Sequence, residues 1–183
     1  MTNTPANTQP TPGPRRNLSG WAINISLIAA IFIGVQWWQA RPMASGEAPE
    51  LSGQLLSGKQ FELAGLKGRP VLVHFWATWC PVCKLGEGDI ASLAGDHQVI
   101  TVAMQSGGRD DIIAYLTERE LSFPVLSDPY GELASAWGVP GVPASFILDA
   151  SGTIHSSTMG YTTKPGIEAR LWAARHLGAA VEH

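Results

Sequence analysis

The chain has 183 residues, of which 45% are hydrophobic and 15% are charged, and its formal net charge is −3. This length suits one domain with a sizeable hydrophobic core. All 15 acidic residues lie after position 46, against nine Lys and Arg in the same stretch. Nucleic acid is therefore not expected as a partner, because a phosphate backbone requires a basic binding face.

The N-terminal region changes composition sharply after residue 17. Residues 1–17 are rich in Thr, Pro and Asn, so we expect a disordered tail. Residues 18–38 are almost continuously apolar and uncharged, and roughly 20 such residues cross a bilayer as a helix. We expect an uncleaved transmembrane signal anchor, because the run ends in paired tryptophans followed by Arg41, which suits a membrane interface. A cleavable signal peptide, cut near residues 42–44, is the alternative.

The charges beside the apolar run predict its orientation. Arg15 and Arg16 precede it and Arg41 follows it, so the positive-inside rule keeps the N-terminus cytoplasmic. We therefore expect a single-pass inner-membrane protein of a Gram-negative cell. Residues 39–50 would be a linker, and residues 51–183 would form a periplasmic domain.

Hydrophobic patterns predict an α/β domain after the linker. We expect strands at 70–76, 98–104, 123–127, 144–149 and 153–158, and helices at 82–95, 109–119, 131–137 and 166–178. Alternation of strands and helices predicts a parallel core. The last two strands flank a turn at residues 150–152 and predict a hairpin, so the sheet is expected to be mixed.

The two cysteines of the chain, Cys80 and Cys83, follow a run of β-branched and aromatic residues. Residues 71–76 read VLVHFW, which is typical of a buried strand, and Pro81 suits the first turn of a helix. Cys80 is thus expected at a helix N-terminus, where free amides and the helix dipole favour a thiolate. Cys83 lies one turn further and can resolve a mixed disulfide, so we predict a redox-active dithiol.

Two other uses of the cysteine pair stay open. A structural disulfide would close a very short loop and stabilise the fold only weakly. A zinc site would need two more ligands, and the chain has no second C-x-x-C and no H-x3-H pair. The other candidate metal ligands show no ligand spacing, and no metal or other cofactor is expected. They are His97, His155, His176, His183, Met43, Met104 and Met159.

Several segments resemble one family. Residues 75–83, FWATWCPVC, resemble the active-site signature of the thioredoxin superfamily in its TlpA-like membrane-anchored branch. Residues 139–149, VPGVPASFILD, resemble the cis-proline loop and following strand of that family. Residues 81–82, 101–107 and 160–163 are similar to the ScsD-like group, named for suppression of copper sensitivity.

The resemblance, which covers about residues 51–177, has structural implications. It implies a thioredoxin-like three-layer fold with a mixed central sheet and a TlpA-type helix-and-strand insertion at 109–127. It also implies a cis proline beside the dithiol. Pro143 directly precedes a strand and is assigned this role, with Val142 as the residue whose backbone meets an extended substrate. Pro140 lies further out and is expected to be trans.

His74 stands six positions before Cys80, where relatives in the thioredoxin superfamily carry aspartate or asparagine. Two interpretations stay open. Imidazole titrates near neutral pH, so His74 could accept the proton of Cys83 during exchange. Alternatively, His74 is a neutral core residue held by one backbone hydrogen bond, because buried polar groups are usually satisfied locally.

Three further positions bear on the dithiol. Many TlpA-like reductases have a glutamate three residues after the second cysteine, where this chain has Gly86. Glu87 is about 100° further round a helix, so it is not expected to replace that carboxylate. Trp76 is expected in the core, and Trp79 on the exposed rim where a partner docks.

The resemblance implies a protein-disulfide oxidoreductase that acts on protein disulfide substrates. Cys80 would attack the substrate disulfide, and Cys83 would release the reduced substrate. Pro81 and Val82 place no cation between the cysteines, so we expect a reductase, kept reduced by a DsbD- or ScsB-like membrane electron donor. Nothing resembles a dimerisation stalk, and a monomer is expected. The alternatives are an apocytochrome c thioreductase and a non-catalytic copper-binding module.

Overall fold

The structure, a computed structural model, describes residues 26–28 and 43–177. Residues 26–28 are helical. Within the described part of the chain, no helix combines the length and apolar character that crossing a bilayer requires. The predicted tail at 1–17 and nearly all of the predicted anchor at 18–38 lie outside the described residues. Both therefore stay predictions.

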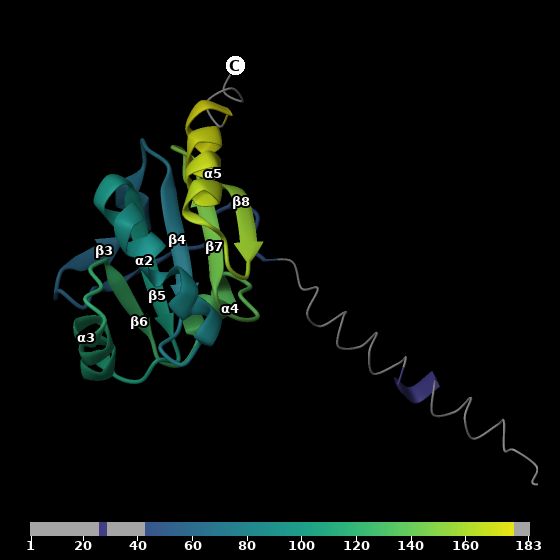
Figure 1. Cartoon of the computed structure of the whole chain (residues 1–183). Coiled ribbons are helices and arrows are strands. Elements are labelled where there is room, and N and C mark those ends of the chain that lie inside the picture. Colours follow the sequence, from purple (N-terminus) through teal and green to yellow (C-terminus); the bar gives the residue numbers. More distant parts are fainter. Residues whose placement is uncertain (1–25, 29–42, 178–183) are drawn as a thin grey trace, which may run out of the picture. The chain divides into compact units, whose positions relative to one another are not determined.

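The chain divides into two units, residues 1–40 and 41–183, and the second unit contains the labelled strands and helices (Figure 1). Their order along the chain alternates strands with helices after a short N-terminal β region. The elements are β1 (Gly46–Glu47), β2 (Ser52–Gln54), β3 (Gln60–Glu62), the 3-10 helix η1 (Leu63–Leu66), β4 (Val71–Trp76), α2 (Pro81–Asp96), β5 (Gln98–Met104), α3 (Arg109–Glu118), β6 (Val125–Asp128), α4 (Glu132–Ala136), β7 (Ala144–Leu148), β8 (Thr153–Met159) and α5 (Lys164–Leu177).

The main sheet has the strand order β1-β8-β7-β4-β5-β6. β4 runs parallel to β5, and β5 runs parallel to β6, whereas β7 is antiparallel to both β4 and β8. The predicted mixed sheet is thus confirmed. β4 lies between two partners and is buried on both faces along its whole length, which explains its unbroken apolar and aromatic sequence.

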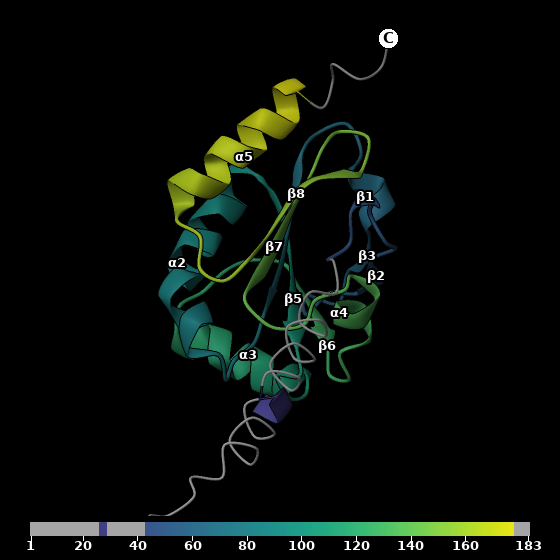
Figure 2. The same ribbon diagram turned by 90° about the vertical axis from the view of Figure 1, so that its right-hand side faces the viewer.

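The sheet is the middle of three layers, as the edge-on view shows (Figure 2). Helices α2, α3 and α5 cover one face, and α4 with the β2–β3 hairpin covers the other. Alternate side chains of β4 face opposite layers: Leu72 packs with Ile90 of α2 and Leu171 of α5, whereas Phe75 packs with Trp137 in the opposite layer. Burying each of these side chains contributes roughly 1.5–3 kcal/mol.

The predicted elements agree with the structure within about three residues at most ends. The helix and strand expected as an insertion at 109–127 are α3 and β6, and β6 forms an edge of the sheet beside β5. The sequence did not predict β1, β2, β3 or η1, because strands of two or three residues are too short to show an alternating pattern.

The linker prediction at 39–50 is wrong for its second half. Gly46 and Glu47 pair with Ile154 and Thr153 of β8, and the Ala44 amide donates to the Trp137 carbonyl at 3.0 Å. Residues 43–50 therefore belong to the folded unit.

Candidate active site

Both cysteines lie where β4 leads into α2. Cys80 is the N-cap residue of α2, with φ −85° and ψ 112°, and Pro81 follows in the first turn, as predicted. The amide of Cys83 donates to the Cys80 sulfur at 3.2 Å. A helix N-terminus thus directs a free amide at the first sulfur, which accepts its hydrogen bond.

The loop before β7 completes the surroundings of Cys80. The peptide bond between Val142 and Pro143 is cis, which confirms the geometry expected at Pro143. The Cys80 thiol donates to the Val142 carbonyl at 3.5 Å. Phe75 of β4 is in register with Ala144 of β7, so strand pairing holds this loop beside the dithiol. The role of Val142 in meeting substrate stays a prediction.

Cys80 and Cys83 form no disulfide with each other, and both are largely covered. Cys80 is 3% exposed and Cys83 is 5% exposed. They lie in one apolar cluster with Trp76, Ala103 and Ile112. Burial, and to a smaller extent the hydrogen bond with Cys80, raises the pKa of Cys83 to about 12. Cys83 therefore stays protonated near neutral pH, while Cys80 holds the helix cap.

His74 is buried on the same side of the sheet. Its Nδ1 lies 2.9 Å from the hydroxyl of Ser145, its partner across the β4–β7 pairing. Burial lowers the pKa of His74 to about 4, so the imidazole is neutral at physiological pH. The hydrogen bond runs to a side chain and not to the backbone group that the core interpretation expected.

Trp79 forms part of the exposed rim, and Trp76 is buried, as expected. The Trp79 side chain is 56% exposed, and its indole N–H donates to the carbonyl of Gln105 at 3.0 Å. The adjacent amide of Thr78 donates to Ser106 at 3.1 Å. Two hydrogen bonds thus hold the segment before Cys80 against the loop after β5.

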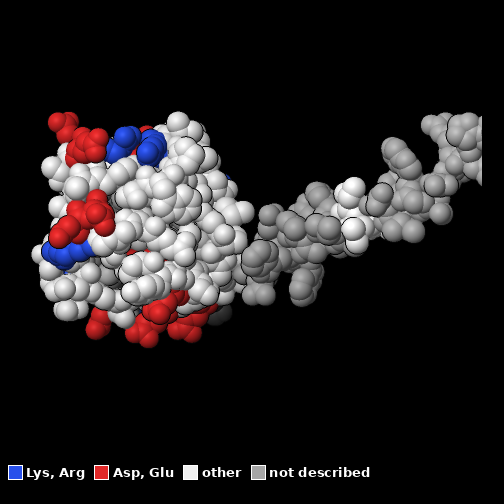
Figure 3. Space-filling model, turned by 90° about the horizontal axis from the view of Figure 1, so that it is seen from below, with Lys and Arg blue, Asp and Glu red and all other residues white. Residues whose placement is uncertain are grey.

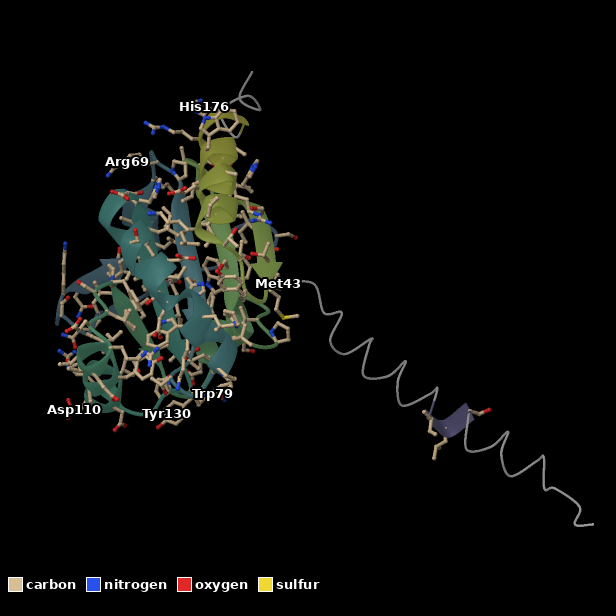
Figure 4. All side chains as sticks on the ribbon, in the orientation of Figure 1. Met43, Arg69, Trp79, Asp110, Tyr130 and His176 are labelled. Carbon is tan, nitrogen blue, oxygen red and sulfur yellow. The ribbon has the colours of Figure 1, made fainter. Side chains whose placement is uncertain are left out.

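The surface around this rim is mostly uncharged. Val82, Leu85, Tyr130 and Tyr161 are exposed apolar or aromatic side chains, and Trp79 and Tyr130 lie at the same end of the domain (Figure 4). Seen from this end, the described surface is mainly uncharged, with Asp, Glu, Lys and Arg side chains near its margins (Figure 3). Such a surface suits contact with another protein.

Comparison with known proteins identifies the family. Residues 44–157 match the model of the AhpC/TSA family. The chain is 34% identical over 140 residues to a thioredoxin-like protein of Haemophilus influenzae, covering 75% of this chain and 83% of that protein. This chain belongs to the AhpC/TSA family.

Two further relatives indicate the chemistry. A thiol:disulfide interchange protein DsbE of Allochromatium vinosum is 31% identical, over 87% of this chain and 89% of that protein. The crystal structure of a putative DsbE from Chlorobium tepidum superimposes with a TM-score of 0.65 at 26% identity, covering 73% of this chain and 99% of that chain. The fold is thioredoxin-like, and the chain is a thiol-disulfide oxidoreductase.

Glu87 does not occupy the position of the family glutamate. Its carboxylate accepts a hydrogen bond from the Tyr115 hydroxyl on α3 at 2.8 Å and binds the guanidinium of Arg119, the C-cap residue of that helix. Tyr115 in turn packs on Trp76, with ring centroids 5.6 Å apart. Glu87 therefore joins α2 to α3, and the space at Gly86 is left to another residue.

Metal ligands do not gather in the described ranges. Among residues 26–28 and 43–177, no group of three or more His, Cys, Asp or Glu side chains could hold a metal ion. His183 lies outside the described residues. The only described cysteines are the two of the dithiol.

Sequence reasoning missed four residues that surround the dithiol. Ser145 forms a hydrogen bond with His74, and Ser106 accepts one from the amide of Thr78. Tyr115 donates a hydrogen bond to Glu87. Tyr161 covers Gly86. Ser145 could have been found from the pairing of the strand that carries His74 with the strand that follows Pro143. Ser106 and Tyr161 lie in the segments 101–107 and 160–163, which carry the family resemblance but do not reveal these contacts, and Tyr115 has no local sequence signal.

Proposed function

We propose that this protein is a membrane-anchored periplasmic reductase of substrate disulfides that works through Cys80 and Cys83. The observation that carries the proposal is the cap of α2, where the Cys83 amide bonds to the Cys80 sulfur at 3.2 Å. The Val142 carbonyl borders the same sulfur, so an extended substrate can pair with the loop while its disulfide meets Cys80.

The reaction follows from the different surroundings of the two sulfurs. The Cys80 thiolate attacks one sulfur of the substrate disulfide, the substrate disulfide bond breaks, and a mixed disulfide forms. Cys83 then attacks the Cys80 sulfur, releases the second substrate thiol and gives up its own proton. The substrate gains two electrons, and the Cys80–Cys83 pair becomes oxidised.

The direction of electron flow depends on how strongly the Cys80 thiolate is stabilised. Strong oxidants stabilise their reduced form. Pro81 and Val82 supply no cation, and among the described residues no Lys, Arg or His side chain hydrogen-bonds to the Cys80 sulfur. We therefore assign to the protein the reduction of substrate disulfides, with a DsbD- or ScsB-like electron donor in the same membrane that keeps its dithiol reduced.

Cellular placement rests on sequence. The apolar run 18–38 and the flanking arginines support an inner-membrane anchor with the enzyme in the periplasm. The dipeptide between the cysteines and residues 160–163 support the ScsD-like group, whose substrates are proteins under copper or oxidative stress. We propose a monomer.

The reduction potential of the full-length chain tests the proposal. Equilibration with glutathione and dithiothreitol buffers should give a value of roughly −200 mV or lower. A Cys83→Ser variant provides the control, because it cannot form the internal disulfide. A value near −120 mV, which is typical of a strong oxidant, would contradict the reductase proposal.

A second candidate is the reduction of apocytochrome c, and the DsbE relative favours it. Apocytochromes present a C-x-x-C-H segment for haem attachment. The experiment compares reduction of a disulfide peptide of that sequence with a peptide of scrambled order. A rate ratio of tenfold or more would support the dedicated reductase, and equal rates would favour a broader substrate range.

Copper binding without catalysis is the third alternative. Reduction of insulin by the wild-type chain, absent in a Cys80→Ser variant, would rule it out. Failure of the wild-type chain to reduce insulin would instead support copper binding by Cys80 and Cys83.

A further inference from the structure

A small cavity lies beside the sulfur of Cys83. Its volume is about 10 Å³, which is room for about one water molecule. Its inner wall is formed by buried His74, Ser145 and Cys83, and its outer rim includes the exposed side chains of Val82 and Tyr161. The cavity therefore lies between the resolving sulfur and the protein surface.

Tyr161 forms part of the outer wall of this cavity. A Cβ atom at Gly86 would lie 3.2 Å from Cε2 and 3.3 Å from Cδ2 of the Tyr161 ring, so the ring occupies the space over the helix where other residues would place a side chain. The ring is half-exposed, at 47%. One of its faces can thus meet solvent while the ring covers α2.

The backbone fixes Tyr161 at this place. Gly160 has φ +91°, a conformation that favours glycine, and its amide donates to the Pro143 carbonyl at 2.8 Å. Met159, two residues before Tyr161, is in register with Ala144. The segment that carries the ring is therefore attached to the loop that borders the dithiol.

Water at this place would change Cys83 directly. Burial is the largest cause that raises the pKa of Cys83 to about 12, because a thiolate loses its hydration in an apolar site. A cavity with room for one water cannot supply the several hydrogen bonds that a thiolate accepts in bulk water. Removal of the Tyr161 ring would let more water molecules reach the Cys83 sulfur.

We propose that Tyr161, lying over Gly86, excludes bulk water from the Cys83 sulfur and thereby keeps the resolving thiol protonated until the mixed disulfide has formed. Tyr161 is a positioning residue in this role and does not touch the reacting sulfur of the substrate. The inference rests on the proposed dithiol function. When Cys83 attacks Cys80, the new S–S bond forms, the substrate leaves as thiolate, and the Cys83 proton passes to solvent or to that thiolate.

Few titratable groups surround the Cys83 sulfur. They are Cys80 on the same helix, His74 from β4, Tyr115 from α3 and Tyr161 after β8. His74 is neutral above pH 4, and burial together with Glu87 raises the pKa of Tyr115. In a Cys80→Ser background, alkylation of Cys83 between pH 7 and 10 therefore reports the Cys83 thiol.

The experiment compares Tyr161→Ala with Tyr161→Phe in the full chain carrying Cys80→Ser, with iodoacetamide as the probe. The Ala variant should alkylate at least tenfold faster at pH 8 and show the rise of its rate at lower pH, because one pKa unit is a tenfold change in thiolate. The Phe variant keeps the ring and should match the parent. Because the Cys83 pKa lies above this pH range, a faster rate alone can also come from easier access of iodoacetamide, so the ultraviolet absorbance of the thiolate is followed in the same variants. An unchanged thiolate fraction in the Ala variant, whether or not the rate rises, overturns the proposal.

Gly86→Ala provides a second route if Tyr161→Ala does not fold. The added methyl group would come within 3.2–3.3 Å of the Tyr161 ring, which must then move by a few tenths of an ångström, while alanine favours the helix. A shift in the same direction supports the proposal, and an unmoved pH dependence contradicts it. Alkylation needs no redox cycle, so its outcome is independent of insulin reduction by the wild-type chain, which tests the proposed function.

Discussion

The two sides of helix α2 differ in how the space beside them is filled. Toward α3, the Glu87 carboxylate binds Tyr115 and Arg119, so charged and polar groups join the two helices. Toward β7 and β8, Gly86 has no side chain, and the ring of Tyr161 lies over it and lines a small cavity. On the α3 side, hydrogen bonds and an ion pair join the two helices. On the other side, the contact to α2 is made by the uncharged ring of Tyr161.

This difference indicates which physical effect controls Cys83. Arg119 compensates the charge of Glu87, and Glu87 is not among the causes that shift the Cys83 pKa. Burial is the largest cause. A carboxylate near the second cysteine is therefore not required to keep that thiol protonated, because exclusion of water has the same effect.

Trp76→Ala is expected to have the largest effect on stability. Trp76 is buried beneath the α3 side, where it packs on Tyr115 and Phe123, and truncating a buried aromatic costs about 3–5 kcal/mol. Urea denaturation measures this loss in the free energy of unfolding. Ile90→Val, a small truncation beside the cavity, is the matched control and should cost about 0.5–1.5 kcal/mol. Equal losses of unfolding free energy in Trp76→Ala and Ile90→Val would contradict the contrast between the α3 side and the cavity side of α2.

His74→Asn should alter stability in acid. The unfolded imidazole binds a proton near pH 6.5, whereas the folded one does so only near pH 4, so protons favour the unfolded state as pH falls between these values. The wild-type chain should lose about 3 kcal/mol from this group across that window, and the variant should lack that part of the loss. The free energy of unfolding at pH 7 and pH 4 provides the measurement.

The same variant separates the two interpretations of His74. An unchanged pH profile of disulfide exchange would rule out His74 as a proton acceptor. A pH profile of exchange from which one titration step disappears in the variant would support His74 as the proton acceptor.

Tyr115→Phe is expected to have the smallest effect of the three. It removes one hydrogen bond to a carboxylate at a partly exposed site, with an expected loss of about 1–2 kcal/mol. In the Cys80→Ser background, the pH dependence of Cys83 alkylation in the Tyr115→Phe variant should be the same as in the parent chain. A shift as large as that expected for Tyr161→Ala would show that the hydrogen-bonded side also controls the thiol.

The sequence predicts the central fold because long elements carry a clear pattern. β4 and β5 are mostly apolar runs, and α2 begins at a recognisable Cys-Pro cap. The pairing of β1 with β8 joins residues more than 100 positions apart, and a two-residue strand contains no alternation that could reveal it. Short edge elements thus depend on tertiary contacts and not on local pattern.

The candidate site divides in the same way. The cap of α2 at Cys80 follows from local sequence, and the cis bond at Pro143 follows from the family resemblance. The Ser145 hydroxyl beside His74 depends on the register of two strands. The position of Tyr161 depends on a missing side chain at Gly86, which sequence shows only as an unexplained departure from the family.

With the proposed anchor, the pairing of β1 with β8 would also limit how far the enzyme can travel. If residues 18–38 form the proposed anchor, only residues 39–42 remain between it and the described folded part, which begins at Met43. Four residues span at most about 14 Å when fully extended. The dithiol would then search a thin layer beside the bilayer, where a partner in the same membrane is present at high effective concentration and a freely diffusing substrate must first come to the surface.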